Sequence, residues 1–83
     1  MQEFMRKFEQ FNGKRVKVLL EHRLFDSQSF DCAELETIDS DTRCGVVIKK
    51  QEMFVYKHNI KVAEMHDNMC IVGDGRLKIT IIL

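Results

Sequence analysis

The apolar side chains at the start of the chain recur with the period of an α-helix. Charged and amide residues occupy one face of this helix. The opposite face is apolar and consists of Phe4, Met5, Phe8 and Phe11. Gly13 can adopt the left-handed backbone at which helices commonly end. We therefore predict an N-terminal helix within residues 1–13. Its aromatic stripe must pack on the rest of the chain, because so short a helix is unstable alone.

After Gly13 the apolar period changes to two, which is the period of a strand. Residues 14–25 predict a long half-buried strand, and the polar residues 26–29 predict a turn. In the following strand, 30–39, Cys32 and Leu35 fall out of phase, which favours a bulge or sharp bend. Further strands are predicted at 44–50, 53–57 and 60–65, with turns at 39–42 and 50–52.

The end of the chain has the pattern of a β-hairpin, with strands at 69–72 and 76–83 around Gly73-Asp74-Gly75. Together these elements predict a mainly β fold, a helix followed by a small, strongly bent antiparallel barrel. The expected single domain covers 1–83, divided into the helix at 1–13, the barrel at 14–65 and the hairpin extension at 66–83. A chain of 83 residues has a small core, so contacts between subunits are the expected additional source of stability.

Charge is balanced overall but distributed unevenly. The chain has 13 basic and 13 acidic residues. Residues 26–42 hold six acids and no base, whereas 43–61 hold five bases and one acid. This alternation indicates either opposite-sign faces on one barrel or complementary edges between identical subunits, unless these are ordinary solvated strand faces.

Several function classes lack their sequence signatures. The chain has no phosphate-binding loop, nucleophile elbow or Cys-x-x-Cys pair, and its histidines and cysteines are not spaced as zinc ligands. We therefore expect no enzyme activity, metal, cofactor or small-molecule substrate. No apolar run approaches the roughly 20 residues of a membrane span, the start is no signal peptide, and the three cysteines suggest no disulfide framework. A cytoplasmic protein without membrane contact is expected.

The most distinctive segment runs from Phe54 to Ile60 and joins two predicted strands. Within it, Tyr56 can anchor by its ring, Lys57 can reach a phosphate, and His58 can stack or donate a hydrogen bond. Such groups at strand ends are held in place by the barrel, as binding groups commonly are. An ordinary turn between two strands is the alternative reading.

The sequence Val-Tyr-Lys-His-Asn-Ile at 55–60 resembles the Tyr-Lys-His-Ala-Ile signature of the Sm-like superfamily, in its bacterial Hfq-like branch. The order of elements over 4–65 is similar too: a helix, a glycine turn, a strand, a bent strand with an Ile38-Asp39 pair, and a third strand. The chain therefore resembles a divergent, phage-type Sm-like protein.

This resemblance implies a five-stranded, SH3-type open barrel whose fourth and fifth strands join about five to seven copies into a ring. It also implies that single-stranded RNA binds at the central pore, where Lys57 and His58 would lie, while Asp39 orients the adjoining loop. The implied RNA-contacting set is Arg43, Tyr56, Lys57, His58 and Asn59. The implied subunit interface is Phe54, Val55, Tyr56, Ile60 and Val62. The alternatives are a small SH3-like barrel acting as a protein-interaction or structural module and, third, a small enzyme.

Three features depart from the Sm-like pattern. Ala33 stands where the family has a glycine at the bend of the second strand, so the bend can differ. The family's base-stacking aromatic after the Asp is missing, and the guanidinium of Arg43 is the nearest substitute. The hairpin at 69–83 is foreign to the short bacterial form. We expect it to cover an open sheet edge and thereby to affect the number of subunits.

Overall fold

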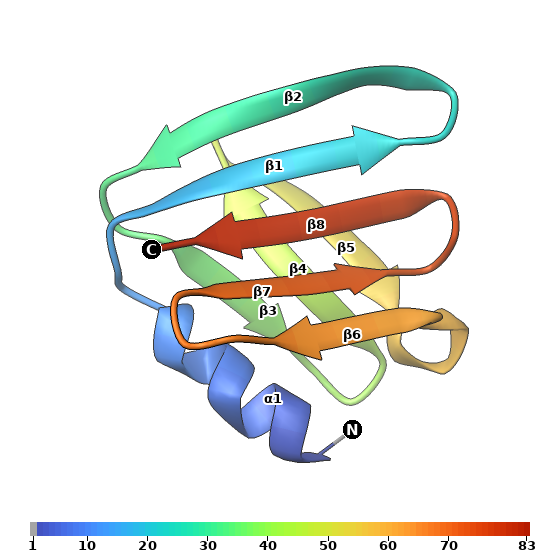
Figure 1. Cartoon of the computed structure of the whole chain (residues 1–83), viewed down its shortest axis with the longest axis horizontal. Coiled ribbons are helices and arrows are strands. Elements are labelled where there is room, and N and C mark those ends of the chain that lie inside the picture. The colour runs from blue at the N-terminus through green and yellow to red at the C-terminus, as the bar shows by residue number, and fades with distance from the viewer. Residues whose placement is uncertain (1) are drawn as a thin grey trace.

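The computed structural model describes residues 2–83, which form two antiparallel sheets and an N-terminal helix (Figure 1). The helical elements are α1 (Gln2–Phe8) and the 3-10 turns η1 (Glu9–Phe11) and η2 (Lys57–Asn59). The strands are β1 (Val16–His22), β2 (Phe25–Cys32), β3 (Glu36–Asp39), β4 (Arg43–Ile48), β5 (Gln51–Tyr56), β6 (Val62–Met65), β7 (Met69–Gly73) and β8 (Leu77–Ile82). Five strands in the order β2-β1-β8-β7-β6 make one sheet, and β3-β4-β5 make the other.

The core lies between the two sheets and is closed at one end by α1. Inward-facing side chains of both sheets, among them Val18, Val46 and Ile79, are completely buried. From the predicted apolar stripe, α1 contributes Met5 and Phe8 and η1 contributes Phe11, while Phe4 is partly buried against the same core. It passes into η1 and ends at Gly13, whose φ of +80° is the left-handed conformation expected there. The predicted helix is therefore confirmed as an α-helix over Gln2–Phe8 that continues as a 3-10 turn to Phe11, and its stripe packs on the sheets. Met1, also within the predicted helix, lies outside the described residues.

The chain changes direction within the predicted second strand, 30–39, but the strand is interrupted there and does not continue through a bulge or bend. The chain leaves β2 at Cys32 and re-enters a strand only at Glu36, now in the other sheet. Leu35, at the bend, is buried and donates its backbone N–H to the Lys14 carbonyl at 2.9 Å. The described strands nevertheless form two separate sheets and do not close into the predicted five-stranded barrel.

The C-terminal hairpin forms where predicted but has a different place in the sheet. It does not cover an outer edge, because β8 pairs with β1 and β7 pairs with β6. Its residues Val72, Ile79 and Ile81 are completely buried in the shared core. The hairpin is thus an internal part of the large sheet, whose edges are β2 and β6.

Two turns differ from the prediction. The first hairpin turns at Arg23-Leu24, and the polar residues 26–29 belong to β2. β2 is an edge strand whose side chains at 26–29 face solvent, so polar residues are tolerated there although they resemble a turn. The later turn lies at Lys49-Lys50, both at positive φ, and Gln51 and Glu52 are already in β5.

Candidate nucleic-acid interface

The segment singled out by the sequence forms η2 and its flanks at one end of the small sheet. β5 ends at Tyr56, and the backbone N–H of Lys57 then donates to the Thr42 carbonyl at 2.7 Å. This bond ties η2 to the β3–β4 turn. The backbone N–H of Ile60 closes the short turn by donating to the Lys57 carbonyl at 3.3 Å. The side chains of 56–59 are therefore held on a short, fixed connection between two strands.

Lys57 is already paired within its own chain. Its Nζ lies 2.8 Å from Oδ1 of Asp39, and the two side chains are 23% and 25% exposed. Asp39 ends β3 and lies opposite Cys44 of β4, so the pair joins η2 to the end of the small sheet. A phosphate approaching Lys57 must compete with this carboxylate.

Aromatic rings form a row along the end of β5. Tyr56 is 44% exposed, and its ring centroid lies 5.4 Å from that of Phe54 and 5.8 Å from that of His58. His58 and Asn59 are exposed on η2. Exposed rings of this kind can stack on unpaired bases, and an exposed carboxamide can bond to base edges.

Arg43 lies beside the same row. It is opposite Tyr56 in the β4–β5 register, and its guanidinium carbon is 4.8 Å from the Phe54 ring centroid. Its Nη1 donates to Oε1 of Glu52 at 3.0 Å. The structure thus gathers Arg43 with the aromatic residues, while Lys57 turns to Asp39.

The predicted interface residues have two different environments. Val55 is buried within its own subunit, so its side chain is not available to a neighbour. Phe54, Ile60 and Val62 are half-buried. Within residues 2–83, both strands that flank η2 lie at sheet edges, since β5 pairs with β4 alone and β6 with β7 alone.

The free edge of β5 can be assigned from the register. The tight turn pairs Ile48 with Gln51, so the backbone groups of alternate residues starting at Gln51 point toward β4. The bond from the Lys57 N–H to Thr42 continues this alternation. The backbone groups of Glu52, Phe54 and Tyr56 therefore point outward, where another strand can pair with them.

Sequence reasoning missed the roles of Glu52 and Thr42. Glu52 lies opposite Val47 in the β4–β5 register, and the Arg43 side chain, opposite Tyr56, reaches it only by extending past the Phe54 ring. The strand pattern alone therefore carries no signal of this contact. The buried thiols Cys44 and Cys70 have their pKa raised to about 12, chiefly by burial. Among residues 2–83, no group of three or more His, Cys, Asp or Glu side chains is arranged to hold a metal ion.

Comparison of the chain with known proteins identifies no relative. No family model matches the chain, and no match was found among curated proteins or solved structures. None of the helices in the described part of the chain is both long and apolar enough to cross a bilayer.

Proposed function

We propose that this protein is a non-catalytic, Sm-like module that binds single-stranded RNA and assembles into a homo-oligomeric ring. The observation that carries the proposal is the position of η2, whose exposed His58 and Asn59 lie between two strands with open edges. This is the place that the Sm-like resemblance of 55–60 assigns to the RNA-contacting turn.

The ring follows from pairing the outward edge of β5 in one copy with the outer edge of β6 in the next. Such a contact is head-to-tail, and it forms a closed ring when the rotation between copies closes. Because η2 directly joins the two pairing strands, every copy holds η2 beside its contacts with both neighbouring copies. The Sm-like resemblance implies that this side of each copy faces the pore. Contacts repeated around an axis increase avidity by roughly 10²–10⁴ without a strong individual site. This allows a chain of zero net charge to bind a polyanion.

We expect the side chains in and around η2 to have different roles in RNA binding. Tyr56 and His58 provide rings for base stacking, and the Asn59 amide provides a donor and an acceptor for a base edge. Lys57 forms an ion pair with Asp39, and this pair holds η2 in place. We expect the same ammonium group also to attract the phosphates of the RNA. Arg43, held by Glu52 and Phe54, supports the aromatic row.

Light scattering and oligonucleotide titration test the proposal. About five to seven copies of 9.8 kDa give an assembly of roughly 50–70 kDa. Labelled oligo-U and oligo-A should bind more weakly as salt rises, because phosphate contacts release counterions.

The double variant His58→Ala/Asn59→Ala should weaken oligonucleotide binding about tenfold or more while the assembly keeps its mass. Lys57→Ala should also weaken binding, without dissolving the ring. The matched control is His66→Ala on the exposed β6–β7 turn, which should bind like the parent. A monomer that binds neither oligonucleotide would refute the proposal and favour the protein-interaction module.

A further inference from the structure

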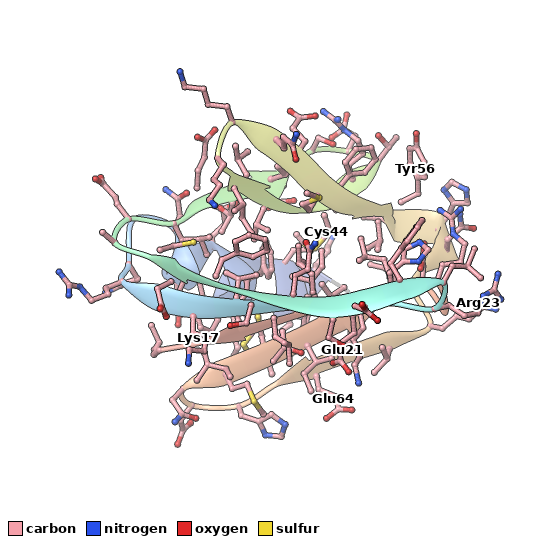
Figure 2. All side chains as sticks on the ribbon, turned by 90° about the horizontal axis from the view of Figure 1, so that it is seen from above. Lys17, Glu21, Arg23, Cys44, Tyr56 and Glu64 are labelled. Atoms are coloured by element: carbon pink, nitrogen blue, oxygen red, sulfur yellow. The ribbon has the colours of Figure 1, made fainter. Side chains whose placement is uncertain are left out.

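Three connections meet at the end of the molecule next to η2. The β1–β2 turn is joined to the β7–β8 turn by a bond from the Arg23 N–H to the Arg76 carbonyl at 2.8 Å. The segment between η2 and β6 joins them, because the Lys61 N–H donates to the Gly73 carbonyl at 2.8 Å. Figure 1 shows these connections together on the right, and Figure 2 places Arg23 at the same end as Tyr56. We call Arg23, Lys61 and Arg76 the three-turn surface.

The cations of this surface are largely available to a ligand. Among residues 2–83, no ion pair is formed by Arg23 or Lys61, and both are exposed. Arg76 is 66% exposed and lies 3.8 Å from Asp74, but that carboxylate is only 6% exposed and is occupied by backbone N–H groups. The nearby Glu21 is paired with Lys78 at 3.5 Å. Asp26, next to Phe25 in the same hairpin, is an exposed carboxylate that forms no ion pair among residues 2–83, so the surplus of positive charge at this end is modest.

An exposed aromatic ring and a groove adjoin these cations. Leu24 and Phe25, at the β1–β2 turn, are each 72% exposed. The Phe25 ring lies 4.9 Å from the His22 ring, which supports it from one side. A groove of about 340 Å³ runs between the turns, lined by His22, Arg23, Val62, Gly75 and Arg76, among others. Proteins bind single-stranded nucleic acid with this combination of groups: an exposed ring stacks on a base, and neighbouring guanidinium groups contact the phosphates.

We propose that the three-turn surface is a second contact site for the RNA strand that binds at η2. The phosphates bind Arg23, Lys61 and Arg76, and a base stacks on Phe25. Lys61 connects η2 to the three-turn surface. It follows Asn59 by two residues, and its ammonium reaches the β7–β8 turn, where it would lie 3.6 Å from a Cβ placed on Gly75. This inference rests on the proposed function and extends it from η2 to the neighbouring turns, which include that of the C-terminal hairpin.

The test compares the double variant Arg23→Gln/Arg76→Gln with Arg6→Gln/Lys7→Gln, which removes two exposed cations from α1. Each is titrated with a short oligo-U that fills only the η2 site and with a longer one of the same sequence. The first variant should bind the longer strand about tenfold more weakly, with a salt slope reduced by about 1.4 for two lost phosphate contacts. Its affinity for the short strand, and both affinities of the control, should not change. Phe25→Ala should give a similar selective loss.

The remaining outcomes overturn the inference. Equal losses in the two double variants would mean that only total charge matters. Unchanged binding of the long strand, with folding verified by an unchanged melting temperature, would mean that the surface is not a contact site. Binding of the parent to phosphatidylcholine–phosphatidylserine vesicles that is lost in Phe25→Ala, without any loss of RNA affinity, would identify a lipid surface instead. Failure at η2 is separate, because it abolishes binding of the short strand.

Discussion

Asp74 shows how a single carboxylate fixes the turn that carries Arg76. Its Oδ1 accepts hydrogen bonds from the backbone N–H groups of Arg76 and Leu77 at 2.8 and 2.9 Å. Desolvation alone would raise the pKa of this carboxyl. The N–H groups of Leu77 and Arg76 and the charge of Arg76 outweigh desolvation, so the pKa lies below the ordinary value of 3.8. The charged form of Asp74 therefore stabilises the fold.

We predict a pH-dependent cost for Asp74→Asn. A carboxyl whose pKa is lower in the folded than in the unfolded state contributes stability above the unfolded value, and loses it as pH falls through the folded value. At pH 7 the variant should be less stable by about 1–2 kcal/mol, and the difference should shrink below roughly pH 4. Urea unfolding at three pH values measures this. Asp67→Asn, in an exposed turn, is the control, and a pH-independent difference would contradict the prediction.

The three thiols should differ in reactivity. Cys44 and Cys70 are completely buried and have pKa values of about 12, whereas Cys32 is only half-buried. Burial and the neighbouring Asp31 raise the pKa of Cys32 as well, so its reaction will be slow near neutral pH. A thiol reagent should modify Cys32 in the folded protein and the other two only after unfolding. In Cys32→Ser no thiol should react before denaturant is added, and early reaction of two or more thiols in the parent would disagree with this structure.

Among the elements, those with a strong apolar period were predictable and those fixed by pairing were not. The stripe of α1 and the alternation of β8 specify their buried faces directly. Nothing local distinguishes residues 26–29 from a turn, because their strand conformation depends on pairing with β1. The place of β8 between β1 and β7 is likewise a tertiary result. Short polar edge strands are therefore where this sequence is least informative.

The β4–β5 turn is strained in a way that can be relieved. Lys49 and Lys50 have φ values of 52° and 67°, as a tight type I′ turn requires, but side chains other than Asn, Asp and Gly adopt this conformation at a cost. Lys50→Gly should stabilise the protein by about 0.5–1 kcal/mol. Lys49 is left in place because its ammonium lies 5.6 Å from the Phe30 ring centroid. The urea midpoint should rise with an unchanged m-value, and a lower midpoint would show that the turn is not strained.

For the molecule as a whole, the sequence located the candidate site but not its internal pairing. Residues 56–59 were predictable from their chemistry at a strand end. The contact of Lys57 with Asp39 was not, because it requires the β3–β4 turn to lie against η2. The three-turn surface was not predictable from the sequence either, because its residues are far apart along the chain and come together only when the C-terminal hairpin pairs within the large sheet.

The proposed ring makes a sharp prediction about the free edge of β5. The Glu52 N–H points outward, and proline at an edge position with an outward N–H is compatible with a strand. In the proposed ring, the Glu52 N–H would donate a hydrogen bond to the strand of the next copy. Proline would remove this donor and would also obstruct the approaching strand. Glu52→Pro should therefore reduce the assembly to single subunits of 9.8 kDa with an unchanged circular dichroism spectrum.

Glu52→Ala is the matched control, because it removes the same carboxylate and its contact with Arg43 but keeps the N–H. It should remain assembled, as light scattering will show. Oligonucleotide affinity should fall with the assembly in Glu52→Pro, since each subunit retains η2 but loses the avidity of the ring. Two variants of equal mass would mean that the copies do not meet through β5. Full affinity in a monomeric Glu52→Pro would mean that one η2 suffices and that the ring is unnecessary for binding.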